Sequence, residues 1–140
     1  MGVKERWART KPIRGSQEEV LRSVLAILRA DKRIEIAYLF GSRAREKAPE
    51  GSDIDIAIFT SKDVTWDDYY RIYGDLTKAL HSDRVDLVWL NRADPLLKFA
   101  VIKEGMVLFY RDPDALNDFE LKAKKEFYDH VIYLKKHRNA

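Results

Sequence analysis

Two short apolar segments separated by little chain constrain the fold of this sequence most strongly. Residues 34–40 (IEIAYLF) are apolar and rich in aromatic side chains, and residues 53–60 (DIDIAIFT) alternate acid and isoleucine before they become wholly apolar. Both patterns predict buried β-strands. A parallel pair needs a crossover that usually contains a helix with its turns, whereas residues 41–52 have room for about one helical turn. We therefore expect the two strands to pair antiparallel.

Helical and strand patterns alternate along the rest of the chain. Apolar residues at helical spacing predict helices over residues 17–30, 66–81, 95–103 and 113–136, and short apolar runs predict further strands over residues 84–90 and 106–110. Ser16 and Thr65 are expected to cap the first two of these helices. This order of elements predicts an α/β fold in which helices pack on a mixed β-sheet of about four strands.

Charge is distributed unevenly along the sequence. The chain of 140 residues carries 26 Lys and Arg against 23 Asp and Glu, but residues 1–15 and 122–140 are basic and the middle is acidic. We expect a basic N-terminal arm over residues 1–15 and a single domain over residues 16–140. The basic ends are either solvated termini or contacts for an anionic partner. The chain has no nucleic-acid-binding motif, so nucleic acid is not expected as a direct substrate.

Composition excludes several classes of protein. Because the chain has no cysteine, disulfide scaffolds, cysteine-ligated metals and thiol nucleophiles are excluded, and any metal would take oxygen or imidazole ligands. Its apolar runs are shorter than the ~20 residues of a membrane helix, and its N-terminus lacks the apolar segment of a signal peptide. We expect a cytoplasmic protein that does not bind a membrane.

Three aspartates interrupt the apolar strands. Asp53 and Asp55 are two residues apart, so they project from the same face of their strand. Asp86 lies within the apolar run VDLVWL. Because a buried, unpaired carboxylate costs several kcal/mol, these acids either face water, paired with Arg43, Arg45 or Arg84, or share a cation. Three carboxylates at the ends of two strands predict an oxygen-ligand site for Mg²⁺.

Gly41 and Ser42 follow the first strand directly. Glycine lets the backbone approach a ligand closely, the start of a helical turn presents unpaired N–H groups, and the serine hydroxyl can donate to a phosphate oxygen. Alone, the pair would also suit an ordinary turn. Because only ten residues separate Ser42 from Asp53, we expect an anion site next to the carboxylates.

This pattern resembles a known family. Gly41-Ser42, ten residues, Asp53-x-Asp55 and a later acid within a strand are similar to the DNA polymerase β nucleotidyltransferase superfamily. The segments GSRAR, SDIDIAIF and VDLVWL resemble its small stand-alone branch, the minimal nucleotidyltransferases (MNT) that accompany HEPN proteins in toxin–antitoxin pairs. The resemblance covers roughly residues 16–136 and implies a palm-like nucleotidyltransferase fold.

The resemblance implies roles for the three acids. Asp53 and Asp55 would bridge two Mg²⁺ ions. Asp86 would hold the ion beside the attacking hydroxyl and help to take its proton. Two such ions stabilise the entering and leaving oxygens of an in-line displacement at phosphorus.

The resemblance also implies a nucleotide site, with ATP as the donor. Gly41 and Ser42 would hold the β- and γ-phosphates, and Ser52 would offer a further hydroxyl. Arg43 and Arg45 would offer positive charge to the triphosphate, although both also suit exposed surface.

The acceptor implied by the resemblance is a tyrosine hydroxyl of a partner HEPN ribonuclease toxin. Transfer of AMP would silence the toxin, so the chain would act as its antitoxin. The sequence shows no additional domain for holding an acceptor, which favours an acceptor that brings its own surface; a homo-oligomer is also compatible. Two alternatives stay open: adenylylation of a small hydroxyl compound, and a degenerate antitoxin that acts by binding alone.

Large side chains on two predicted helices invite two interpretations. Four aromatic residues crowd the helix over residues 66–81, namely Trp66, Tyr69, Tyr70 and Tyr73. They form either a core stripe or an exposed patch for a partner or a second copy. The same two interpretations apply to the aromatic residues and the basic end of the last helix.

Overall fold

A mixed, four-stranded β-sheet forms the centre of the molecule. The computed structural model describes residues 11–45, 48–49 and 51–138. Within these, the strand order is β3-β2-β1-β4. β1 pairs antiparallel with β2 and β4, while β2 and β3 are parallel. The α/β fold and the antiparallel first pair are therefore confirmed, with strands β1 (Ile34–Phe40), β2 (Ile54–Thr60), β3 (Val85–Trp89) and β4 (Met106–Tyr110).

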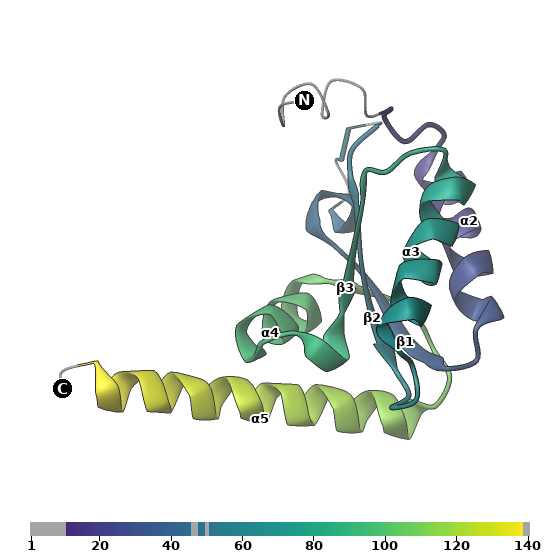
Figure 1. The fold of residues 1–140 in the computed structure, drawn as a ribbon. Helices are drawn as coiled ribbons and strands as arrows, with labels where there is room; N and C mark the ends of the chain where they lie inside the picture. Colours follow the sequence, from purple (N-terminus) through teal and green to yellow (C-terminus); the bar gives the residue numbers. More distant parts are fainter. Residues whose placement is uncertain (1–10, 46–47, 50, 139–140) are drawn as a thin grey trace.

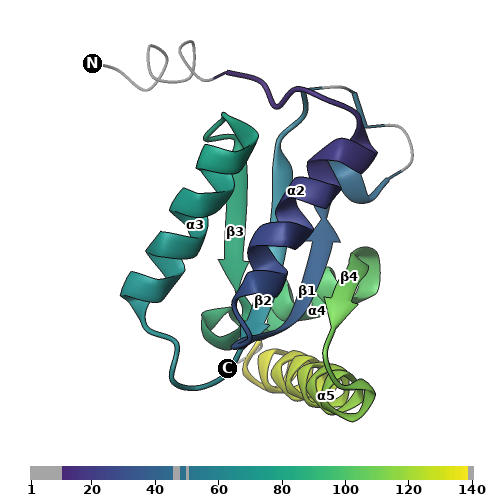
Figure 2. The same ribbon diagram turned by 90° about the vertical axis from the view of Figure 1, so that its right-hand side faces the viewer.

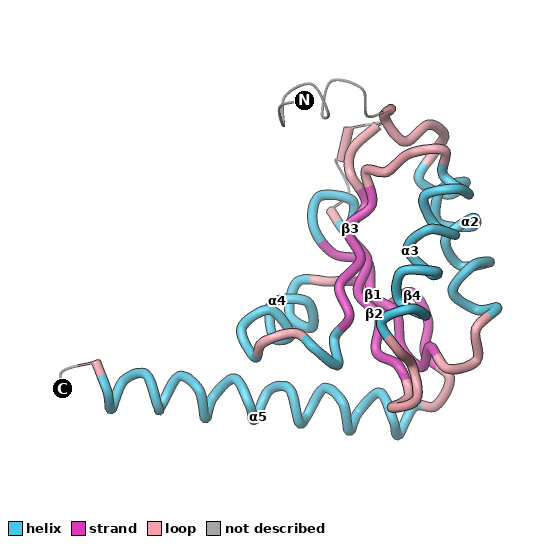
Figure 3. The backbone as a smooth tube through the Cα atoms, in the orientation of Figure 1, coloured by secondary structure: helices cyan, strands magenta, loops and turns pink. Residues whose placement is uncertain are grey.

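Helices cover the two faces of the sheet differently (Figures 1 and 2). α2 (Gln17–Ala30) and α3 (Trp66–Leu80) lie side by side on one face. α4 (Pro95–Glu104) lies on the other face, and α5 (Pro113–His137) runs across one end of the sheet and continues past α4. Figure 3 shows the resulting L-shaped outline, with the strands in the upright part and α5 as the foot.

The helices begin where the sequence provides caps. The side chains of Ser16 and Thr65 each accept a hydrogen bond from the backbone N–H three residues later. Asp94 and Asp112 cap α4 and α5, and a proline follows each cap at the first helical position, where its missing N–H costs nothing. These local signals explain why each predicted helix and strand ends within one residue of its predicted position.

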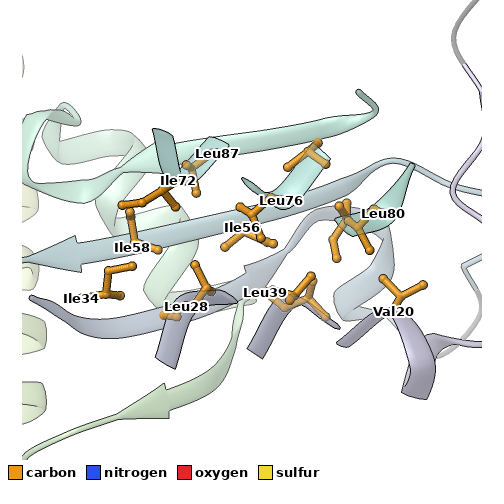
Figure 4. Close-up of a cluster of buried hydrophobic side chains, with 14 of the residues drawn as sticks. Val20, Leu28, Ile34, Leu39, Ile56, Ile58, Ile72, Leu76, Leu80 and Leu87 are labelled. Atoms are coloured by element: carbon orange, nitrogen blue, oxygen red, sulfur yellow. The ribbon is translucent and has the colours of Figure 1, made fainter. Parts of the chain in front are cut away.

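Alternation along β2 divides the core into two clusters and positions the acids. Ile54, Ile56 and Ile58 pack against α2 and α3, and Figure 4 shows the last two among their neighbours from β1, α2 and α3. Ala57 and Phe59 belong to the cluster beneath α4 and α5. Successive side chains of a strand point to opposite faces. Asp55 therefore faces the α4 side of the sheet.

The packed domain begins upstream of the predicted boundary at residue 16. Ile13 is fully buried in the main core and forms an isolated antiparallel bridge with Gly51. The Ser82 hydroxyl donates to the carbonyl oxygen of Lys11. Residues 11–13 thus pack on the domain, while the rest of the predicted arm, residues 1–10, lies outside the described residues.

Of the four aromatic residues of α3, two pack in the core and two are exposed on the surface. Tyr69 stacks on Trp89 with ring centroids 5.9 Å apart, and Tyr73 is half-buried against the main core. Trp66 and Tyr70 are exposed. No helix among the described residues has the length and apolar character needed to cross a membrane.

Candidate active site

Strand register brings the predicted acids together at one end of the sheet. In the parallel β2/β3 pair, Asp55 lies directly opposite Asp86, so the two side chains project from the same face. Asp53 is the residue before β2. In the antiparallel β1/β2 pair, Asp55 also lies opposite Phe40, the last residue of β1. The three acids and the turn after β1 therefore meet where β1 ends and where β2 and β3 begin.

The carboxylates repel one another. Asp55 is half-buried, and its pKa is raised first by burial and then by the negative charges of Asp86 and Asp53. Asp53 and Asp86 are exposed at the rim. Like charges that share one site disfavour each other's ionised form. The site would therefore gain from a bound cation.

Arg84 lies two residues before Asp86 in the sequence. From the sequence alone, it is only one possible partner for the acids. It precedes β3, and its carbonyl oxygen accepts the N–H of Ile54, which places it beside the start of β2. Its Nε lies 4.0 Å from Oδ1 of Asp53. That Nε is buried and has no hydrogen-bond partner among the described residues. Arg84 offsets part of the negative charge, and its position next to Asp53 follows from strand pairing rather than from any local motif.

Gly41 is required where the turn passes the carboxylate. Its φ of +70° lies in the left-handed region, which L residues with a Cβ rarely adopt. A methyl group at this position would also overlap the carboxylate of Asp55. Ser42 is exposed beside it at the start of η1 (Gly41–Ala44), a 3₁₀ turn. Backbone and hydroxyl groups are thus brought to the acids, as the anion-site prediction requires.

Arg43 is buried, which the sequence around it does not indicate. Its side chain is only 4% exposed. Nε donates to the carbonyl oxygen of Ser52 at 2.9 Å, and Nη1 donates to Oε1 of Gln17 at 2.9 Å. The Gln17 amide donates in turn to the carbonyl oxygen of Arg43 at 2.8 Å. Arg43 therefore ties η1 to α2 and to the segment before β2, and burial lowers its pKa.

The other predicted nucleotide-binding residues lie around the same turn. The Ser52 hydroxyl donates to the carbonyl oxygen of Pro49 at 2.6 Å, which engages it in a local turn. Arg45 is exposed and, with Ser16 and Met106, lines a hollow of about 500 Å³ beside η1. Arg43 also lines this hollow but is only 4% exposed, so Arg45 is the more accessible of the two predicted arginines.

The donor set suits a hard cation that is only partly held by protein. Among the residues that the structure describes, no three His, Asp or Glu side chains gather closely enough to enclose a metal ion. Mg²⁺ usually takes one or two carboxylates and completes its shell with waters and substrate phosphates. A pair of facing carboxylates with a third at the rim, under mutual repulsion, fits that mode of binding.

A family model decides what kind of protein carries this site. The model described as "Polymerase beta, Nucleotidyltransferase" matches residues 22–114, which include the turn and all three acids. The chain belongs to this family. This nucleotidyltransferase is 32% identical over 88 residues to a protein named putative protein adenylyltransferase from Methanocaldococcus jannaschii. The match covers 63% of this chain and 92% of the relative.

Solved structures of toxin–antitoxin complexes contain similar chains. One is a complex of a tri-AMPylated Shewanella oneidensis HEPN toxin with MNT antitoxin; the similar chain has 25% identity and a TM-score of 0.71, with 89% of this chain and 97% of that chain covered. Another is a toxin–antitoxin structure with AMP-PNP, at 26% identity and a TM-score of 0.72, with 85% and 95% covered. The resemblance to the MNT branch is thereby confirmed.

Proposed function

We propose that this nucleotidyltransferase transfers AMP from ATP to a tyrosine hydroxyl of a HEPN-type toxin and so acts as its antitoxin. The observation that carries the proposal is the placement of Asp55 opposite Asp86, with Gly41 packed against the Asp55 carboxylate. Similarity along most of the chain to a structure that contains an AMPylated HEPN toxin supports the choice of acceptor.

The acids supply the charge and the base of the reaction. Asp53, Asp55 and Asp86 would hold two Mg²⁺, which would supply Lewis acidity at the α-phosphate. Asp86 is exposed at the rim, where an incoming hydroxyl can reach it, and would accept its proton. A phenol, with a pKa near 10, gives up that proton more readily than an aliphatic alcohol. The new bond joins the tyrosine oxygen to the α-phosphorus, and pyrophosphate leaves.

The turn after β1 would hold the rest of the triphosphate. Gly41 and Ser42 would contact the β- and γ-phosphates, because both are exposed and Gly41 lies directly beside Asp55. Arg45 would add positive charge from the neighbouring hollow. Arg43 and Ser52 would contribute by keeping η1 in place, since Nε and Nη1 of Arg43 and the Ser52 hydroxyl already donate hydrogen bonds there; Nη2 of Arg43 has no partner among the described residues.

Label transfer from ATP tests this proposal. The purified chain is incubated with Mg²⁺, ATP labelled at the α-phosphate and a purified HEPN toxin. Label should appear on the toxin, and Asp53→Asn/Asp55→Asn should abolish transfer while leaving the fold intact by circular dichroism. Label on a small molecule alone would indicate the other enzymatic function. Full protection of cells by the double variant would instead show that the chain neutralises its toxin by binding alone.

A further inference from the structure

Two arginines beside the candidate active site are held in different ways. Arg43 is buried and donates to the carbonyl oxygen of Ser52 and to Oε1 of Gln17. The Arg84 side chain makes no hydrogen bond among the described residues, although its Nε is buried. Its ion-pair partner is Asp53, at 4.0 Å between Nε and Oδ1, which is longer than a hydrogen bond. Arg43 is therefore fixed by the fold, whereas Arg84 is held near the acids by charge.

Strand register sets this ion pair directly before the other two acids. In the parallel β2/β3 pair, Asp86 lies opposite Asp55. Arg84 and Asp53 each lie two residues earlier in the chain, and the carbonyl oxygen of Arg84 accepts the N–H of Ile54. Residues two apart in an extended segment share a face. The oppositely charged pair at the rim thus lies on the same face as the like-charged pair behind it.

The four side chains carry an excess of negative charge that Arg84 reduces. Three ionised carboxylates and one guanidinium have a net charge of −2. One divalent cation balances that charge, but a second would make the site positive. A nucleoside triphosphate brings the negative charge that balances a second cation. Arg84 therefore disfavours cations that bind alone and favours the nucleotide.

A cation bound by Asp53 would also meet Arg84 directly. Hard divalent cations take carboxylate oxygens as ligands, so such a cation and the guanidinium would compete for one carboxylate. The side chains of Asp53 and Arg84 are 53% and 30% exposed, so solvent screens part of their interaction and both can exchange partners. Arg84 would weaken binding of a cation alone without preventing it.

We propose that Arg84 is the internal counter-ion of the site: it pairs with Asp53 and disfavours a cation that arrives alone, so that cations load together with the nucleotide. The inference rests on the proposed function in one respect, because it takes Asp53 to be a cation ligand and a nucleoside triphosphate to be the substrate. It adds a residue that controls the order of loading to the acids that hold the cation.

Cation binding by the full chain without nucleotide tests the inference. Mn²⁺, a hard divalent ion that takes the same oxygen ligands, is followed by the loss of the EPR signal of the free ion. Arg84→Gln should bind Mn²⁺ about fivefold more tightly than wild type, the factor expected for unit charges at the 4.0 Å of this ion pair in water. Asp53→Asn/Asp55→Asn should abolish the binding, which would assign it to the acids.

Binding of a fluorescent ATP analogue in EDTA should change in the opposite direction. Without the guanidinium the triphosphate meets only carboxylates, so Arg84→Gln should bind the analogue at least about threefold more weakly. Arg84→Lys keeps the charge and should match wild type within about twofold in both assays. Replacement of a side chain that served only the fold would weaken both kinds of binding. Tighter cation binding with weaker nucleotide binding is therefore specific to a counter-ion.

Arg92→Gln is the matched control. Arg92 lies in η2 (Leu90–Arg92), at the opposite end of β3, where its guanidinium packs over the ring of Trp89. The substitution removes the same charge far from the acids and should leave Mn²⁺ binding within about twofold of wild type. Circular dichroism should show that both Gln variants are folded.

Several results would overturn the counter-ion inference. These are Mn²⁺ binding by Arg84→Gln that is no tighter than in wild type, an equal gain in Arg92→Gln, and absence of Mn²⁺ binding in both wild type and Arg84→Gln. Neither assay involves a toxin or transfer of AMP. Failure to label a toxin, together with tighter Mn²⁺ binding by Arg84→Gln, would contradict the proposed function and leave the counter-ion inference standing.

Discussion

Two groups of aspartates at opposite ends of the sheet show how differently one residue type can be used. At one end, Arg33 donates to Asp31 and Asp68 with ion-pair distances of 3.1 Å, and Arg71 also contacts both acids. At the other end, the negatively charged Asp55 and Asp86 face each other, and Arg84 approaches only Asp53, at 4.0 Å.

The pKa values follow this difference in charge balance. Hydrogen bonds from Arg33 lower the pKa of Asp31, and those from the Thr65 backbone and Arg33 lower the pKa of Asp68. Burial and the neighbouring acids raise the pKa of Asp55. The first group is neutralised within the fold and stabilises it. The second group is left without sufficient positive charge, which is typical of a site that takes its counter-ion together with its substrate.

The largest expected effect is the loss of catalysis in Asp55→Asn. The amide keeps the shape of the side chain but removes the charge that would hold the metal. Since a metal ion contributes several kcal/mol to transition-state stabilisation, the rate of AMP transfer should fall at least about 100-fold. Label transfer to the toxin measures the rate. A rate within a few-fold of wild type would show that Asp55 is not part of the catalytic site.

Gly41→Ala should come next, because it disturbs the same site through the backbone. Alanine must adopt a φ of +70° and its methyl group must displace the Asp55 carboxylate, so both transfer activity and melting temperature should fall. Gly74→Ala is the control, since an added methyl group at this α3 position meets nothing within 4 Å. It should stabilise the protein by about 0.5–1 kcal/mol and leave transfer unchanged. Equal behaviour of the two variants would contradict the proposed fit between Gly41 and Asp55.

Arg33→Gln should affect stability without affecting chemistry. It removes the nearer of the two cations that Asp31 and Asp68 share and leaves only Arg71, so the melting temperature at neutral pH should fall by a few degrees. Lowered pKa values mean that these acids stabilise the fold above their ordinary pKa, near pH 4, and that this contribution is lost as the pH falls further. Wild type should therefore lose more stability than the variant on acidification, as thermal melts would show. A changed AMP-transfer rate per folded molecule would contradict the view that the Asp31 and Asp68 group affects only stability.

The smallest expected effect has the opposite sign, and it concerns the stability of Asp55→Asn without metal. Because the pKa of Asp55 is raised in the folded state, ionisation of this group opposes folding as the pH rises through that value. The variant should melt slightly higher than wild type at neutral pH. The difference should shrink as acid protonates Asp55 in the wild type. A variant that melts lower than wild type at neutral pH would mean that Asp55 stabilises the fold.

Local sequence signals predicted the helices and strands and the three candidate aspartates. The burial of Arg43 and Ile13 was not predicted, because it depends on contacts between segments that are distant in the sequence. Ser16, Pro95 and Gly41 act on their own neighbours, so the sequence predicts where their elements begin or end. The burial of Arg43 depends on Gln17, 26 residues away, and the burial of Ile13 depends on the segment around residue 51. No local pattern shows such pairings, which is why the sequence did not reveal that Arg43 is buried and braces η1; its contact with a nucleotide stays a prediction.

The response of stability to Mg²⁺ tests the central comparison most directly. Thermal melts of wild type and Asp55→Asn are recorded with and without Mg²⁺ and a non-hydrolysable ATP analogue. If the carboxylates at the start of β2 and β3 bind a cation together with the nucleotide, Mg²⁺ with the analogue should raise the melting temperature of wild type and change that of the variant far less. An equal rise in both proteins would contradict this account of the site.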